Sequence, residues 1–166
     1  MSRPKELLKP TKTRYILLSF AIALLIKMLP FGSTMVRYIP DFSGMLVLYW
    51  TINQPRKFGI GWSCIVGLAC DMTGASTFGQ HALAYTLSSY LVTLRQRQLI
   101  MYNLGQQALV VLALLLFNHG VMSLARLITG SAFVGWSYFV SPFIGSLLWP
   151  LLTTLLLLLQ RRGHRT

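Results

Sequence analysis

The sequence alternates between long apolar runs and short basic segments, and this alternation leaves few folds open. Hydrophobic residues make up 54% of the 166 residues, whereas only 11% are charged. A soluble domain carries about 25% charged residues, so water cannot be the main solvent of this chain. Runs such as residues 109–117 lack the period of two that a membrane β-barrel needs. The chain is therefore predicted to be an all-α integral membrane protein.

The apolar runs predict a compact bundle of about six transmembrane helices. They cover residues 15–29, 41–52, 58–73, 78–94, 104–124 and 136–159. This transmembrane domain, residues 15–159, lies between two basic tails at residues 1–14 and 160–166. Pro142 and Pro150 are expected to bend the last helix, because each removes an intrahelical hydrogen bond.

The second and third runs are shorter than the ~20 residues of an ordinary crossing. The alternative is a re-entrant hairpin, which would place Arg56 and Lys57 inside the bilayer at a cost of at least ~2.5 kcal/mol each. Tilting or local thinning of the bilayer costs only fractions of a kcal/mol per Å. Two full crossings are therefore favoured.

The basic residues predict the orientation of the helices. With six crossings, twelve of the fifteen Lys and Arg fall on one side of the membrane and two on the other, while Lys27 lies within the first run. By the positive-inside rule, both termini are expected in the cytoplasm of a multi-pass inner-membrane protein. In the loops and the C-terminal tail, the residues expected to set this topology are Arg56, Lys57, Arg95, Arg97, Arg161 and Arg162.

The net charge of +12 does not indicate a nucleic-acid partner. A nucleic-acid-binding protein gathers its basic groups on one folded polar face, whereas here they lie in the gaps between apolar runs. Membrane lipid with anionic headgroups is the partner that this distribution predicts.

Asp71 is the only acidic residue in the interior of an apolar run, since Asp41 stands at the start of its run, and the surroundings of Asp71 suggest a close helix contact. Gly67, Asp71 and Gly74 fall on one helix face, and small residues on such a face let a neighbouring helix approach. Lys27 is expected at a similar depth, so the two side chains could pair in the outer third of the membrane. Alternatively, Lys27 extends to the interface and Asp71 caps the end of its own helix.

Further polar residues are expected at the same level of the bundle. They are Gln80, His81, Tyr85, Asn118 and His119. Together with Lys27 and Asp71 they could form a cavity or a partner-docking surface, or they could be the polar fringe that any helix carries near an interface.

Catalysis is not predicted, and neither is a cofactor or a metal. The three histidines lack metal-ligand spacing, and the sequence contains neither a nucleophile elbow nor a dinucleotide fingerprint. A single intramembrane carboxylate cannot supply paired acid-base chemistry.

The chain resembles the rod shape-determining MreD family over nearly its whole length. The matching segments, in order, are LSFAIALL at 18–25, Pro30, Pro40-Asp41, LYW at 48–50, Pro55-Arg56, Gly67-Leu68 with Asp71, Gly74-x-Ser76-x-x-Gly79, HALA at 81–84, QQALVV at 106–111 and LLWP at 147–150. Each segment alone is weak, because apolar runs match by composition, but their order and spacing together are specific.

The resemblance implies a non-enzymatic membrane scaffold of the bacterial elongation complex, which maintains cell shape and lateral peptidoglycan synthesis. It implies MreC as the direct partner and, through the complex, MreB, RodA and the elongation-specific transpeptidase. It also implies a fold similar to the substrate-binding subunits of vitamin-uptake transporters. The alternative function is a small-molecule-binding membrane subunit of an uptake transporter, with the same polar residues lining a pocket.

Overall fold

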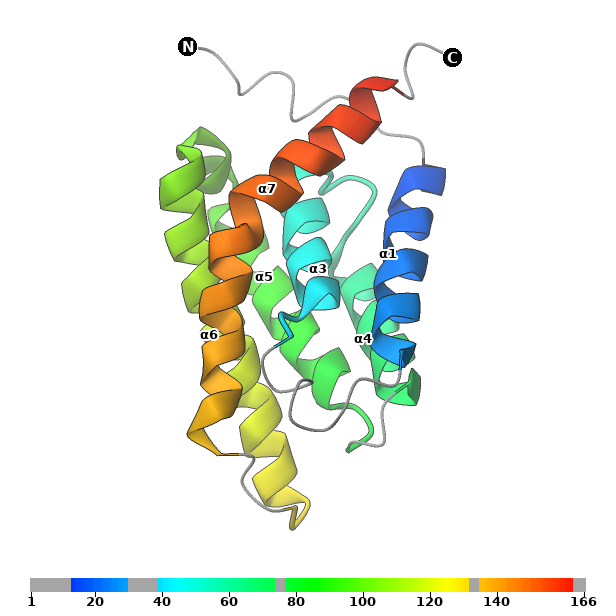
Figure 1. Cartoon of the computed structure of the whole chain (residues 1–166), viewed down its shortest axis with the longest axis vertical. Helices are drawn as coiled ribbons and strands as arrows, with labels where there is room; N and C mark the ends of the chain where they lie inside the picture. The colour runs from blue at the N-terminus through cyan, green and yellow to red at the C-terminus, as the bar shows by residue number, and fades with distance from the viewer. Residues whose placement is uncertain (1–12, 30–38, 74–76, 132–134, 163–166) are drawn as a thin grey trace.

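The computed structural model describes residues 13–29, 39–73, 77–131 and 135–162, and the side chains up to residue 160. These residues form six α-helices and one short 3-10 helix (Figure 1). In chain order they are α1 (Thr13–Met28), α3 (Phe42–Asn53), α4 (Ile60–Thr73), α5 (Gln80–Met101), α6 (Leu104–Ile128), η1 (Trp136–Phe139) and α7 (Val140–Arg162). The predicted all-helical bundle of six helices is confirmed.

Helix α3 occupies the centre of the bundle. Every residue from Ser43 to Asn53 is buried, and α1, α4, α5, α6 and α7 all contact α3. A helix that is apolar on all sides is stable only when it is surrounded in this way. Figure 1 shows α3 between α1 on one side and α6 and α7 on the other.

The ends of α3 are set by local chemistry. Asp41 follows Pro40 and caps the helix, because its carboxylate accepts a hydrogen bond from the Gly44 N–H at 3.2 Å. The helix ends at Asn53, and Gln54 leaves the helical conformation with φ −133° and ψ 54°, since the α region is disfavoured for a residue that precedes proline.

Helix α5 is longer than the sequence predicted. The fourth apolar run ends at residue 94, but the helix continues through the polar residues that follow it to Met101. Arg, Gln and Leu are good helix formers, so the polarity of this segment marks exposure and does not end the helix. The chain turns at Tyr102, and the Gln106 side chain accepts from the Asn103 N–H at 3.2 Å to start α6.

Two helical segments are long and apolar enough to cross a membrane, α6 and the stretch Trp136–Gln160 that joins η1 to α7. Each has 25 residues, or ~37 Å at ~1.5 Å per residue. Pro150 lies inside α7, and Figure 1 shows this helix changing direction along its length. Helices α1, α3 and α4 are shorter, with 16, 12 and 14 residues.

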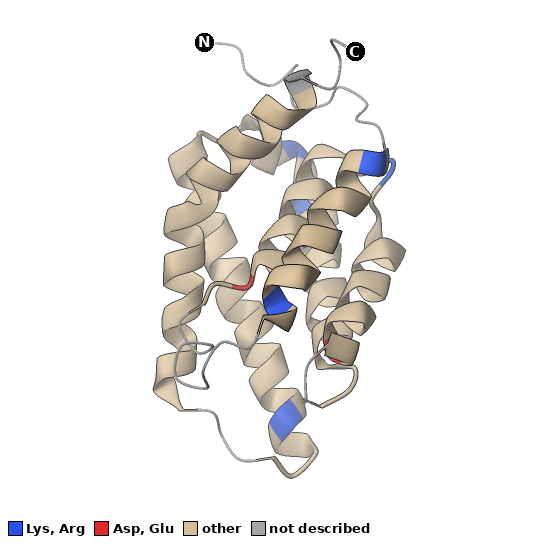
Figure 2. Cartoon of the chain, turned by 45° about the vertical axis from the view of Figure 1, so that its right-hand side comes forward, with Lys and Arg blue, Asp and Glu red and all other residues tan. Residues whose placement is uncertain are grey.

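Successive helices run in opposite directions, so two ends of the bundle can be distinguished. At the end that we call the basic end, α1, α4 and α6 begin and α3, α5 and α7 finish (Figure 1). Arg14, Arg56 and Lys57 lie there, as do Arg95 and Arg97 in the last turns of α5. Figure 2 shows this concentration of basic residues, with few on the remainder of the bundle.

Candidate functional site

A group of polar side chains lies between the helices toward the opposite end of the bundle. We call it the polar cluster. Its members are Lys27, Asp41, Asp71, Gln80, His81, Tyr85, Asn118, His119, Arg126 and Tyr138. The members lie on α1, α4, α5, α6 and η1, and Asp41 caps the start of α3. Every helix except α7 therefore contributes to the polar cluster.

Asp71 caps the start of helix α5. Its two carboxylate oxygens accept hydrogen bonds from the backbone N–H groups of Gly79, His81 and Ala82 at 3.0, 3.1 and 3.3 Å. The first N–H groups of a helix have no partner within the helix, and the helix dipole favours a negative charge at this position. Asp71 thus stabilises the start of the helix that follows its own.

Gly67 makes this cap possible. A Cβ atom on Gly67 would lie 2.4 Å from the Cα atom and 2.5 Å from the backbone N of Ala82. The glycine therefore lets α4 touch the backbone of α5 one turn before Asp71, on the same face. Gly74, which the sequence placed on this face as well, lies outside the described residues.

His81 lies between the two charged residues that the sequence paired. Its Nδ1 atom is 2.7 Å from an Asp71 oxygen, and its Nε2 atom is 3.0 Å from Lys27 Nζ. A lysine ammonium group only donates hydrogen bonds, so Nε2 accepts and the Nδ1–H donates to Asp71. The direct Lys27–Asp71 contact that the sequence suggested is thus replaced by a chain of three groups from α1, α5 and α4.

A second branch of the polar cluster leads from α5 to α6 and η1. Gln80 accepts a hydrogen bond from Arg126 Nε at 2.8 Å. The Arg126 guanidinium lies 5.5 Å from the centre of the Tyr138 ring, within the range of a cation–π contact. The Tyr138 ring packs on His119, with 4.5 Å between ring centres, and His119 Nδ1 lies 2.9 Å from the Leu115 carbonyl oxygen.

A third branch joins α5 to the start of α3. The Tyr85 hydroxyl group lies 2.8 and 2.7 Å from the two Asp41 oxygens and can donate to either. Because Asp41 also caps α3, this contact fixes the entry of the central helix against α5.

Sequence reasoning missed three members of the polar cluster. Asp41 enters the sequence analysis only as the start of an apolar run and in the Pro40-Asp41 segment of the family resemblance, although it is one of three acidic residues in the chain. Arg126 falls just after the fifth apolar run, which ends at residue 124, whereas α6 continues to Ile128. Tyr138 gave no signal, since aromatic residues near helix ends are common in membrane proteins.

Asn118 differs from the other members of the polar cluster. Its side chain is 0% exposed, and neither its amide nitrogen nor its amide oxygen has a hydrogen-bond partner in the described part of the chain. Buried amide groups normally have partners, because an unpartnered one is costly.

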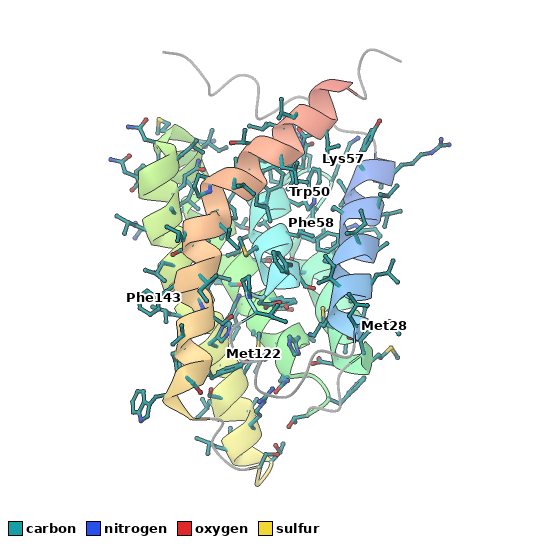
Figure 3. All side chains as sticks on the ribbon, viewed as in Figure 1. Met28, Trp50, Lys57, Phe58, Met122 and Phe143 are labelled. Atoms are coloured by element: carbon teal, nitrogen blue, oxygen red, sulfur yellow. The ribbon has the colours of Figure 1, made fainter. Side chains whose placement is uncertain are left out.

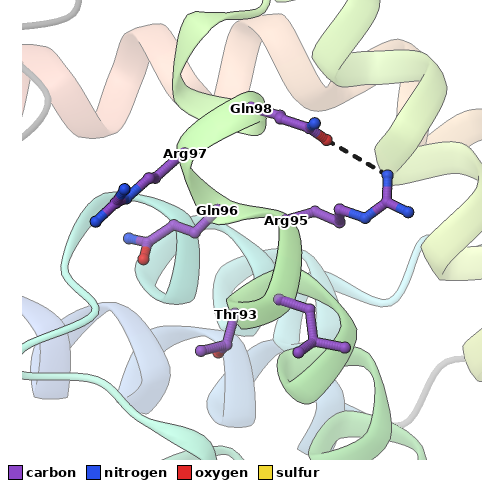
Figure 4. Close-up of a pocket in the computed structure, with 6 residues that line it drawn as sticks. Thr93, Arg95, Gln96, Arg97 and Gln98 are labelled. Carbon is purple, nitrogen blue, oxygen red and sulfur yellow. Dashed lines mark hydrogen bonds between the residues drawn. The ribbon is translucent and has the colours of Figure 1, made fainter.

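Four of the predicted topology-setting residues have described side chains, and these four lie away from the polar cluster. Arg56 and Lys57 are in the turn before α4, and the side chains of Arg161 and Arg162 are outside the described part of α7. Arg95 and Arg97 line a hollow of about 320 Å³ along residues 93–98 of α5 (Figure 4). The two arginines point in different directions there, and Arg95 donates to Gln98 at 3.4 Å, so the hollow has no convergent set of ligand-binding groups.

Within the described ranges, no group of three or more His, Cys, Asp or Glu residues could hold a metal ion. The polar cluster consists mainly of groups that hydrogen-bond to one another across helix boundaries.

The chain is similar to known proteins of one family. A family model described as rod shape-determining protein MreD matches residues 11–159. The chain is also 30% identical over 149 residues to the rod shape-determining protein MreD of Haemophilus influenzae, covering 89% of this chain and 91% of that protein. No solved structure matches the chain.

Replacing Gly67 with alanine should separate α4 from α5. The added Cβ would overlap backbone atoms of Ala82, which cannot move independently of the helix, and overpacking of this kind typically costs about 1–3 kcal/mol. Gly61→Ala in the same helix is the matched control, because nothing lies within 4 Å of its Cβ position. Unfolding in mixed detergent micelles measures both, and equal stability of the two variants would contradict the close contact.

Replacing Asp71 with asparagine should lower the free energy of unfolding by about 1–3 kcal/mol, because one acceptor of the α5 cap becomes a donor. A double-mutant cycle with His81→Gln should show coupling of at least about 0.5 kcal/mol, as expected for residues in contact. The cycle of Asp71→Asn with His119→Gln, in the branch through η1, is the control. Additive effects in the first cycle would show that the Asp71–His81 contact contributes nothing.

Proposed function

The chain belongs to the MreD family of rod shape-determining proteins, and on this premise we propose that it is a membrane scaffold of the bacterial elongation complex. The family is non-enzymatic and determines rod shape. The chain itself is a membrane protein with apolar helices. In our proposal it holds other proteins in a fixed geometry during lateral peptidoglycan synthesis.

The observation that carries this proposal is the inward-facing polar cluster. Asp71, His81 and Gln80 are 3%, 8% and 1% exposed, and their polar atoms bind groups on neighbouring helices. Networks of this kind rigidify a packed interior. A rigid bundle with exposed apolar faces suits a protein that positions partners in the membrane, so we assign the cluster to holding the helices together.

MreC is the partner that we propose for direct binding, with MreB, RodA and the elongation-specific transpeptidase reached through the complex. An apolar helix face is a suitable docking surface for a membrane helix, since such helices associate through close packing. The cluster residues are then indirect determinants of binding, because they fix the relative positions of the helices that present the surface.

We further propose six membrane crossings with both termini in the cytoplasm. Residues 15–159 then form the transmembrane domain, with residues 1–14 and 160–166 as basic cytoplasmic tails. The alternating helix directions support this topology. So does the distribution of described basic residues, since Arg14, Arg56, Lys57, Arg95 and Arg97 share the basic end and the positive-inside rule assigns that end to the cytoplasm.

One observation favours a second candidate function, the small-molecule-binding subunit of an uptake transporter. The buried Asn118 amide without a partner among the described residues is a group that a bound molecule could satisfy. A fold similar to vitamin-uptake subunits would be consistent with this role.

The topology predicts which positions reagents reach. Ser131 is exposed beyond α6, and Asn103 is exposed between α5 and α6 at the basic end. In a chain with Cys64 and Cys70 replaced by alanine, Ser131→Cys should react with a membrane-impermeant maleimide in cells whose outer membrane has been opened. Asn103→Cys should react only after the inner membrane is opened as well, and the reverse pattern would refute the proposed orientation.

Depletion of the protein should turn rod-shaped cells of its host into spheres without creating a nutrient requirement. Expression of Gly61→Ala should restore rods and MreC co-purification, whereas Gly67→Ala should restore neither, because a displaced α4 alters the scaffold. Rescue of the depleted cells by one added metabolite would instead support the uptake function. Retention of MreC by a Gly67→Ala chain of reduced stability would show that binding does not need the fixed helix geometry.

A further inference from the structure

Among the residues that the structure describes, the apolar surface that α1 and α4 expose is short. On α1 the exposed apolar residues extend from Leu17, 52% exposed, to Met28, 64% exposed, with Leu29 directly after the helix. On α4 they extend from Trp62, 42% exposed, to Met72, 76% exposed. At ~1.5 Å per residue, these stretches cover ~18 Å and ~15 Å along the helices.

The apolar surface of α6 and α7 is longer. On α7 it extends from Val140, 42% exposed, to Leu159, 47% exposed, and on α6 from Leu109 to Ile128. Each of these stretches covers ~28 Å, close to the ~30 Å of an ordinary hydrocarbon core. Figure 3 shows Phe143 of α7 pointing away from the bundle, while Trp50 and Phe58 lie inside it.

The short and long faces lie on opposite sides of the bundle. Helices α1 and α4 contact each other, and α6 contacts α7, with α3 between the two pairs in Figure 1. Any tilt of α1 or α4 shortens further the membrane thickness that it spans, so tilting of these two helices cannot lengthen the short face.

Basic residues mark the limit of the short face. Arg14 lies one turn before Leu17 and is exposed, and Arg56 and Lys57 are exposed in the turn before α4. A charged side chain in hydrocarbon is costly, so these residues hold the start of α1 and of α4 at the membrane surface. Lys27, near the other end of α1, turns inward to His81 and does not extend the lipid-facing surface.

We propose that the α1–α4 face binds phospholipid with short acyl chains and thins the bilayer beside it, while the α6–α7 face contacts bilayer of ordinary thickness. The inference rests on the crossing of the membrane by these helices proposed above, but not on which end faces the cytoplasm. A protein shorter than the hydrocarbon core on one side is accommodated by thinning of the adjacent lipid. The partner of this face is therefore lipid, selected by chain length.

Tryptophan quenching by brominated phospholipids tests the chain-length preference of each face separately. The exposed Trp62 and Trp136 are replaced by phenylalanine, whereas Trp50 and Trp149, each 1% exposed, stay as a constant background that lipid cannot contact. Leu25→Trp on α1, at a position 65% exposed, reports one face, and Phe143→Trp on α7, at a position 55% exposed, reports the other. Each variant is reconstituted in phosphatidylcholine mixtures with monounsaturated chains of about 14, 18 or 22 carbons, which bracket the ~30 Å core.

The reporter on α1 should favour the shortest chains over the longest by several fold, and the reporter on α7 should favour the middle length. Thr13→Leu combined with Arg14→Leu lengthens the apolar surface of α1 and should shift its preference toward longer chains. Identical profiles at the two reporters would overturn the proposal. Absence of quenching at Leu25→Trp would also overturn it, because protein would then cover this face. Maleimide labelling of Ser131→Cys and Asn103→Cys in cells, as described above, shows separately whether the helices cross the membrane.

Discussion

The constraint on which the rest of the structure depends is that hydrocarbon offers no hydrogen bonds to the start of a helix. Helix α5 meets this constraint through Asp71, which supplies acceptors for three backbone N–H groups. Because the carboxylate comes from α4, one interaction both completes a helix and joins two helices. Gly67 allows α4 to approach the backbone of α5 closely, and His81 connects Asp71 to Lys27 of α1. Without this cap, unsatisfied backbone groups would face lipid or apolar side chains.

The same principle organises the central helix. Asp41 caps α3 and binds the Tyr85 hydroxyl group of α5, so an acidic residue again serves both a helix end and a contact between helices. Nearer the middle of the bundle, the hydroxyl groups of Ser63, Ser89 and Thr51 connect α4, α5 and α3. Hydrogen bonds and close packing thus replace the hydrophobic effect, which gives little drive to association within a membrane.

Much of the architecture could be predicted from the sequence, because apolar runs, and turn residues such as Pro55, divide the chain into helices. Asp71 could also be identified as a candidate site residue from the sequence, because acidic residues are so few. The partners of Asp71 depend on how α4 and α5 are placed relative to each other in space, which no local sequence pattern encodes. For this reason the spacing of residues predicted neither the cap on α5 nor the position of His81 between Lys27 and Asp71. Helix α5 was predicted too short because the first polar residues after its apolar run were taken as the end of the helix. For the same reason, Arg126 was placed outside α6.

The central position of α3 has a consequence for biogenesis. This helix emerges from the ribosome second among the described helices, yet two of its neighbours, α6 and α7, are synthesised last. A segment of 12 residues is shorter than the ~20 that anchor stably in a bilayer on their own. Until α6 and α7 are synthesised, only α1, α4 and α5 can pack against α3. The core is therefore complete only after the final helix has been translated. In a chain truncated before α7, the part of the core that α7 covers would stay exposed, and quality-control proteases could recognise it.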